Sequence, residues 1–216
     1  MSDSETLPVE FFQRSHLTVA EALIGCTLVW DGVGGIVVET EAYAAEGDAA
    51  CHTSFRPSAR DFFARHSPGT AYVYLNYGVH WLLNVLTEDG IVLLRALQPT
   101  RGLKQMARRR GKSGENELCS GPGKIGQALR LSGRDHGTSL LTLKRCFLRR
   151  APDIRLTVCS DYRVGLSRAV DYPWRFLAED HPCVSVPRGK AQNKPSRSGK
   201  GRYQGSSGGS TKRCCR

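Results

Sequence analysis

Three segments with the composition of β-strands follow one another between residues 71 and 97, and short turns separate them. Residues 71–77 are rich in tyrosine and valine, residues 81–85 are largely apolar, and residues 91–97 form a third apolar segment. Asn76, Tyr77 and Gly78 have the composition of a tight turn, which joins antiparallel neighbours into a hairpin. The segments therefore predict an antiparallel sheet, with Tyr77 near the exposed tip of a hairpin.

A further strand and several helices are expected around this sheet. Residues 35–41 are mostly β-branched, follow a glycine-rich turn and end in acidic side chains, which predicts a strand. Thr18 and Glu21 match a capping box, so a helix is expected to begin at Thr18, and Pro99 is expected to begin a basic helix that runs to Arg110. We predict an α+β fold, a single mixed domain with a curved antiparallel sheet and surrounding helices.

The positive charge of the chain is concentrated at its C-terminal end. The 216 residues include 31 Lys and Arg and 20 Asp and Glu, but nine of these bases and none of the acids lie in residues 187–216. That segment is rich in glycine and serine without apolar periodicity, so we expect a disordered tail. It is expected either to attract a polyanion weakly or to act only as a solubilising extension. Residues 1–186 are expected to form one domain.

Cysteine spacing and hydropathy argue against a metal site, secretion and a membrane span. Six of the eight cysteines are scattered singly and no Cys-x-x-Cys pair occurs, which favours buried thiols in a reducing compartment over disulfides or zinc ligands. No uncharged apolar run approaches the roughly 18 residues that a membrane helix needs, and residues 1–10 do not resemble a signal peptide. We therefore expect no metal, no cofactor and no membrane partner.

Charged residues within the predicted strands suggest a site. Because alternate residues of a strand share a face, Glu39, Glu41 and Tyr43 are expected to project together. Arg95 lies within an apolar segment, where a charge needs a partner, and Glu41 is a candidate for that partner. From these residues alone, an exposed acid at a strand end and tyrosines packed into the core remain open alternatives.

Residues 121–126 formally match the nucleotide-binding pattern G-x-G-x-x-G, but their context argues against it. They follow a charged linker and contain Pro122, and Ile125 stands where a P-loop requires Ser or Thr after the lysine. The segment instead predicts a helix N-terminus, where backbone amides and Lys124 face a nucleic-acid phosphate. A tight loop without a ligand is the alternative.

Four separated segments, in this order along the chain, resemble the alkyladenine (3-methyladenine) DNA glycosylase family over roughly residues 23–186. They are Glu-Thr-Glu-Ala-Tyr at 39–43, Tyr-Val-Tyr-Leu-Asn-Tyr-Gly at 72–78, Leu-Leu-Arg-Ala-Leu at 93–97 and Leu-Cys-Ser-Gly-Pro-Gly-Lys at 118–124. The resemblance implies a monofunctional N-glycosylase. Such an enzyme flips alkylated or deaminated purines out of duplex DNA and hydrolyses the glycosidic bond, which initiates base excision repair. Candidate substrates are 3-methyladenine, 7-methylguanine and hypoxanthine.

The resemblance also implies catalytic and DNA-binding roles for particular residues. Glu41 aligns with the general base that deprotonates the attacking water, and Arg95 with the arginine that helps to hold this water and the carboxylate. Tyr77 matches the tyrosine at the tip of a hairpin that inserts into the minor groove of DNA. Lys124 remains the candidate for a phosphate contact.

Four further residues match the pocket that receives the extruded base. Tyr43, His52 and Tyr74 match side chains that sandwich this base, and Asn84 matches a residue that helps to exclude normal guanine. Alkylation at a ring nitrogen leaves a purine cationic, and tyrosine faces attract a cation by roughly 0.5–2 kcal/mol. Aromatic walls therefore favour the damaged base.

One departure and two rival functions qualify this prediction. Where the family usually has an arginine–asparagine pair, this chain has Arg60 and Asp61, which leaves the substrate range open. A non-catalytic protein that binds damaged DNA or other nucleic acid would use the same tyrosines for stacking. A bifunctional glycosylase/lyase would need a lysine at the site, and the segments around Glu41, Tyr74 and Arg95 contain none.

The expected partner is double-stranded DNA that contains damaged purines. The sequence has no coiled-coil pattern, so a monomer is expected. The expected location is the cytoplasm, at the nucleoid, in a prokaryote or the nucleus in a eukaryote.

Overall fold

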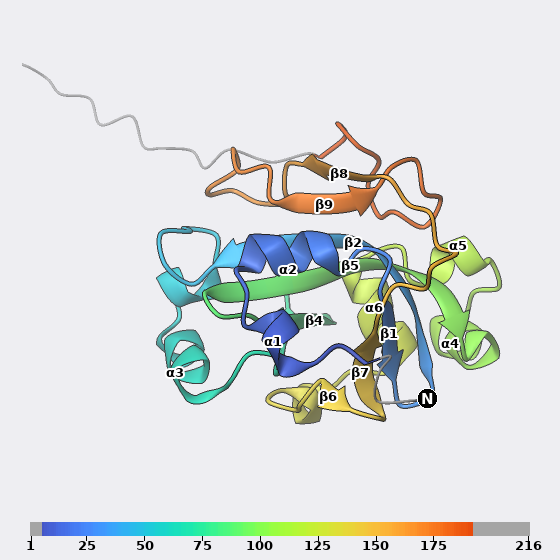
Figure 1. Cartoon of the computed structure of the whole chain (residues 1–216), viewed down its shortest axis with the longest axis horizontal. Coiled ribbons are helices and arrows are strands. Elements are labelled where there is room, and N and C mark those ends of the chain that lie inside the picture. Colours follow the sequence, from blue (N-terminus) through green and yellow to red (C-terminus); the bar gives the residue numbers. More distant parts are fainter. Residues whose placement is uncertain (1–5, 192–216) are drawn as a thin grey trace, which may run out of the picture.

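The computed structural model of the chain describes residues 6–191. A nine-stranded antiparallel sheet forms the framework of this part of the chain (Figure 1). Seven strands follow the order β3-β4-β5-β2-β1-β7-β6, and β9 pairs with both β2 and β8. The strands are β1 (Thr27–Trp30), β2 (Val33–Ala44), β3 (Ala71–Asn76), β4 (His80–Leu86), β5 (Gly90–Arg101), β6 (Leu141–Thr142), β7 (Arg145–Leu148), β8 (Val158–Asp161) and β9 (Arg175–Ala178).

Strand β2 is the centre of the sheet. One edge pairs with β5 over almost its whole length, while the other edge pairs first with β1 and then, from Glu39 to Glu41, with β9. The β2–β5 register shifts between Val37 and Thr40, and such irregularities bend a strand and increase its twist. The expected α+β domain with a curved antiparallel sheet is confirmed.

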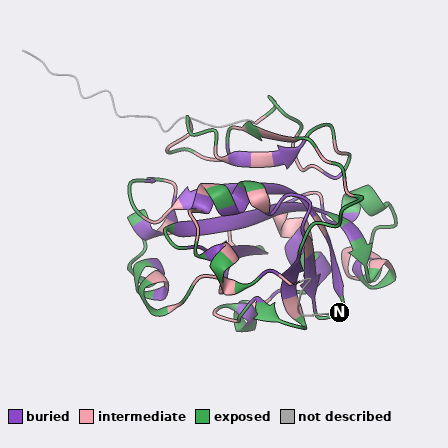
Figure 2. Cartoon of the chain, in the orientation of Figure 1, coloured by how far each residue is buried: buried purple, intermediate pink, exposed green. Residues whose placement is uncertain are grey.

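Helices cover the sheet, and the buried residues follow the long central strands (Figure 2). Helix α2 packs against β2 and β5, and α6 packs against β4, β5 and α4. The α-helices are α1 (Val9–Phe12), α2 (His16–Ala22), α3 (Pro57–Arg65), α4 (Leu103–Arg110), α5 (Glu115–Leu118) and α6 (Pro122–Leu129), and the 3-10 helices are η2 (His52–Ser54) and η3 (Gly133–Asp135).

The predicted hairpin is present between β3 and β4. Its last pair is Asn76 with His80, so Tyr77, Gly78 and Val79 form the tip. Tyr77 has φ 49° and Gly78 has φ 70°, and this left-handed region is tolerated by glycine but uncommon for tyrosine. The turn therefore imposes its conformation on Tyr77, whose side chain is 89% exposed.

Two predicted helix starts are wrong. Helix α2 begins at His16, because Ser15 is the N-cap and its side chain accepts a hydrogen bond from the Thr18 backbone N–H. Pro99 does not begin a helix, since β5 continues to Arg101 and α4 starts only after Gly102, whose φ is 67°. Pro99 pairs with Gly35 beside a register shift, a position where a strand tolerates a residue without an N–H group.

The described chain continues past residue 186. The Gly189 N–H donates to the Asp161 carboxylate at 2.8 Å, so the first residues after 186 still contact the domain. The remainder of the expected tail, residues 192–216, lies outside the described residues.

Candidate active site

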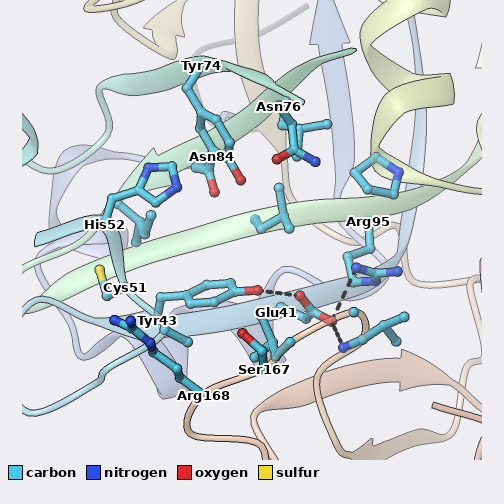
Figure 3. A pocket seen from close by; sticks show the side chains of 18 of the residues that line it. Glu41, Tyr43, Cys51, His52, Tyr74, Asn76, Asn84, Arg95, Ser167 and Arg168 are labelled. Carbon is cyan, nitrogen blue, oxygen red and sulfur yellow. Dashed lines mark hydrogen bonds and ion pairs between the residues drawn. The ribbon is translucent and has the colours of Figure 1, made fainter. Parts of the chain in front are cut away.

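A cavity of about 600 Å³ opens between the β3–β4 hairpin, the segment around η2 and the loop at residues 164–168. Its volume is within the range of ordinary small-molecule pockets. Seven of the eight predicted site residues line it: Glu41, Tyr43, His52, Tyr74, Tyr77, Asn84 and Arg95. In Figure 3, Tyr74, Asn84 and His52 lie on one side of the cavity, and Tyr43 and Glu41 lie on the other.

Glu41 is fully buried at the cavity wall, and two hydrogen bonds and one ion pair hold its carboxylate. The Tyr43 hydroxyl donates to Oε2 at 2.7 Å, and the Val164 backbone N–H donates to Oε1 at 2.6 Å. The Arg95 guanidinium lies 3.2 Å from the same Oε1, so the predicted ion pair between Glu41 and Arg95 is confirmed. Burial and the charge of Glu41 raise the pKa of Tyr43, which therefore remains a donor.

Arg95 also forms an ion pair with a second buried carboxylate, that of Glu39. Its Nε lies 2.9 Å from Oε1 of Glu39, and Arg175 contacts that oxygen at the same distance. The Ser185 backbone N–H donates to Glu39 Oε2 at 2.6 Å. Although burial alone lowers the pKa of Arg95, the charges of Glu41 and Glu39 raise it, so the guanidinium stays charged. The expected common face of Glu39, Glu41 and Tyr43 is thus confirmed, and the buried charges compensate one another.

The aromatic side of the cavity is held by contacts between rings. The His52 and Tyr74 ring centroids are 4.3 Å apart in an edge arrangement, and His52 Nδ1 lies 2.9 Å from the Tyr72 hydroxyl. Burial, followed by the charge of Arg56, lowers the pKa of His52 to about 4. His52 is therefore neutral near pH 7. Asn84 Nδ2 donates to the Tyr72 carbonyl at 2.9 Å, which fixes the amide within the wall.

Sequence reasoning missed the segment that supplies the Val164 donor. Arg163 is 0% exposed, and its guanidinium lies 4.6 Å from the centre of the Tyr43 ring. It pairs with Asp48 and donates to the Ala42 carbonyl at 3.0 Å, so it ties the 162–169 loop to β2. A hydrogen bond from a backbone N–H cannot be predicted from the pattern of side chains. An arginine in a polar loop is ordinarily expected to be an exposed surface charge. The clustered aromatic residues at 162, 172 and 174 were the nearest available signal.

Lys124 is the one predicted site residue that does not line the cavity. Its Nζ donates to the Ser120 hydroxyl at 2.9 Å. The predicted helix start here is confirmed, because α6 begins at Pro122, and Pro122 does line the cavity. Asp61, the departure noted in the sequence, lies on α3 with its carboxylate 4.0 Å from Arg65 and also lies outside the cavity wall.

Residues 6–191 contain neither a cluster of metal ligands nor a membrane-spanning helix. No group of three or more His, Cys, Asp or Glu side chains in this range is arranged to hold a metal ion. None of the helices in the same range has the length and apolar character of a membrane span.

Comparisons with known proteins give the class of the protein. Relatives from Rhodopseudomonas palustris, Agrobacterium fabrum and Chlorobaculum parvum, each provisionally named a 3-methyladenine DNA glycosylase, are 43%, 43% and 39% identical to this chain. The matches cover 82%, 85% and 84% of this chain and 86%, 94% and 91% of the respective relatives. The α+β fold with a buried carboxylate beside an aromatic cavity is therefore that of a DNA glycosylase, an enzyme of DNA repair.

The family assignment follows from a second comparison. The family model described as methylpurine-DNA glycosylase matches residues 10–182. The chain belongs to the methylpurine-DNA glycosylase family.

Proposed function

We propose that this enzyme removes alkylated purines, above all 3-methyladenine and 7-methylguanine, from duplex DNA. In this proposal, the damaged nucleotide is flipped into the cavity and a water activated by Glu41 hydrolyses its N-glycosidic bond. One observation carries the proposal: the buried carboxylate of Glu41 and the rings of Tyr43, His52 and Tyr74 line the same cavity.

The hydrogen bonds of Glu41 suit a general base. A carboxylate has about four acceptor sites. At Oε1 the described contacts are a hydrogen bond from Val164 and an ion pair with Arg95, and at Oε2 there is one hydrogen bond, from Tyr43. The second site on Oε2 is the one we assign to the proton of the attacking water. Arg95 is close enough to the same carboxylate to help orient that water. General-base catalysis of this kind typically contributes about 10²- to 10⁴-fold to the rate.

The walls of the cavity suit a cationic purine. Tyr43 and Tyr74 supply aromatic rings to the wall, and the lowered pKa of His52 keeps that ring neutral at pH 7. The charge of Arg95 is compensated by two carboxylates, so it adds little repulsion. We assign Asn84 to the exclusion of normal guanine through contact with its exocyclic amine.

Extrusion of a nucleotide needs a group that replaces the base in the stack. Tyr77 lies at the hairpin tip, is 89% exposed and also lines the mouth of the cavity. We therefore assign it the role of the inserting side chain. The cavity is formed by one chain, which supports action as a monomer, and the relatives are bacterial, which supports action at the nucleoid.

The described wall of the cavity includes no lysine, which supports a monofunctional enzyme, because a lyase step requires an amine that forms a Schiff base. Sodium borohydride should therefore trap no covalent adduct between the protein and damaged duplex. A trapped adduct would replace the monofunctional mechanism with the bifunctional one.

The proposal is tested by base release from duplex DNA that contains 3-methyladenine, 7-methylguanine or hypoxanthine. We expect release of the two cationic bases, and slower release of hypoxanthine, because a neutral leaving group lacks the positive charge that weakens the bond. A protein that binds these duplexes without releasing any base would be the non-catalytic binder, and the proposed activity would be wrong.

A further inference from the structure

A second cavity, of about 320 Å³, borders the same hairpin at Val79, His80 and Trp81. We call it the basic groove. Val79, His80 and Trp81 line it from the hairpin, Arg109 lines it from α4, and Gln127 and Arg130 line it from the end of α6 and the residue that follows. The groove thus combines two cationic side chains with an apolar wall.

The two arginines of the groove lie close enough to repel each other. Burial, followed by the positive charge of Arg130, lowers the pKa of Arg109. Among residues 6–191, no ion pair with a carboxylate is formed by either Arg109 or Arg130, and the nearby Asp31 is engaged by Arg145. The Arg109 guanidinium is positioned by a 2.7 Å hydrogen bond to the Ala128 carbonyl. Two adjacent cations without a carboxylate suit an anionic ligand.

Two elements connect the groove to the candidate active site. The hairpin lines the first cavity with Asn76 and Tyr77 and the groove with the residues that follow. Helix α6 begins at Pro122 in the wall of the first cavity and ends beside Arg130 in the groove. An eight-residue helix is about 12 Å long, which equals the axial length of about three to four nucleotides of one DNA strand.

We propose that the basic groove binds the phosphodiester backbone of duplex DNA, three to four nucleotides from the flipped one, through Arg109 and Arg130. Val79 and Trp81 line the same groove, where they are placed to contact the deoxyribose beside the bound phosphate. This inference rests on the proposed function, because that function places the flipped nucleotide in the first cavity. It extends that function by naming a backbone contact that positions the duplex.

Arg130→Gln and Arg109→Gln, singly and together, test the groove in a binding assay. Affinity for an undamaged 20-base-pair duplex is measured between 50 and 200 mM KCl. Each lost phosphate contact lowers the slope of log affinity against log salt by about 0.9, so the ratio of affinities at the two salt concentrations falls about threefold. The double variant should lower that ratio about tenfold.

Two controls separate a groove contact from general charge and from misfolding. Arg108→Gln removes the same charge from the neighbouring residue of α4, which does not line the groove, and should leave the slope close to that of the wild type. Arg109→Lys keeps the charge and should keep the slope. Thermal unfolding followed by circular dichroism checks that every variant is folded.

An unchanged slope in folded Arg130→Gln and Arg109→Gln would overturn the groove proposal, as would an equal loss in Arg108→Gln. These outcomes are independent of base release. If the wild type releases damaged bases while the slopes do not change, only the groove is wrong. If the slopes change while no base is released, the proposed function is wrong.

Discussion

Glu41 illustrates how a charge is kept inside this protein. A buried carboxylate without partners is strongly destabilising. Glu41 accepts a hydrogen bond from Tyr43 on its own strand, forms an ion pair with Arg95 on β5, and accepts a hydrogen bond from Val164 in a distant loop. The first two were predictable, because strand alternation places Tyr43 on the same face and a charge within an apolar strand requires a partner. The Val164 donor was not predictable, because a backbone N–H 123 residues away carries no local signature.

His52 gives a pH-dependent prediction at the same scale. Its pKa falls from an ordinary 6.5 to about 4 in the folded protein, through burial and then Arg56, so folding favours the neutral ring. The resulting stability is fully present above pH 6.5 and is lost as the pH falls towards 4. In urea unfolding experiments, the free energy of unfolding of the wild type should fall over this range more steeply than that of His52→Gln. Equal pH dependence in the two proteins would show that His52 is not the titrating group.

At the scale of elements, the hairpin was the most predictable part of the sheet and its shortest strands were the least. Asn76 and Gly78 marked the turn between two strand-like segments, and the observed pairing follows directly. Strands β1, β8 and β9 are only four residues long. Strands β1 and β9 form because β2 pairs with them, and β8 forms because β9 pairs with it; these are tertiary causes that local sequence does not report.

The two wrong helix starts have different causes. Thr18 matched a capping box, but Ser15 supplied an equivalent cap one turn earlier. Pro99 resembled the first residue of a helix, but pairing with β2 extended β5 through it. At α2 one local cap competed with another, whereas at Pro99 long-range strand pairing overrode the local signal.

Tyr77→Ala tests the hairpin as the inserting element. Because the side chain is 89% exposed, its removal should change the free energy of unfolding by no more than about 0.5 kcal/mol. Loss of the group that replaces the extruded base should nevertheless slow single-turnover release of 7-methylguanine about tenfold or more, since unstacking is worth a few kcal/mol.

Leu143→Ala is the matched control for this change. It removes another exposed apolar side chain, 61% exposed, from the turn between β6 and β7, and it should leave base release unchanged. If Tyr77→Ala released bases at the wild-type rate, Tyr77 would not be the inserting residue.

At the scale of the whole molecule, β2 assembles the site. Its pairing with β5 brings Arg95 to Glu41, and its pairing with β9 fixes the end of the loop that carries Arg163 and Val164. Arg163 and Asp48, both fully buried, then lock this loop against the strand. Five of the seven predicted residues in the cavity belong to three motifs, at 39–43, 72–78 and 93–97, which lie on strands of one sheet or at the tip of the hairpin. Asn84 lies on β4 of the same sheet, and His52 lies on η2.

The side chains of the site could therefore be predicted from the sequence, but the scaffold around them could not. The residues at 41, 43, 74, 84 and 95 belong to strands whose alternation or motif could be recognised. The buried pair of Asp48 with Arg163 joins positions 115 residues apart, and the basic groove joins a hairpin to the ends of two helices. Both features depend on how the helices and strands are packed together.

The central claim, that Glu41 activates water beside a flipped base, is tested most directly by Glu41→Gln in single-turnover release of 7-methylguanine from duplex DNA. Affinity for the damaged duplex is measured in parallel, and Glu46→Gln, an exposed acid in the same region, is the control. We predict that release falls by at least about 10²-fold in Glu41→Gln, that affinity for the damaged duplex stays within a few-fold of the wild type, and that Glu46→Gln is unaffected. Release at the wild-type rate by folded Glu41→Gln would contradict the account.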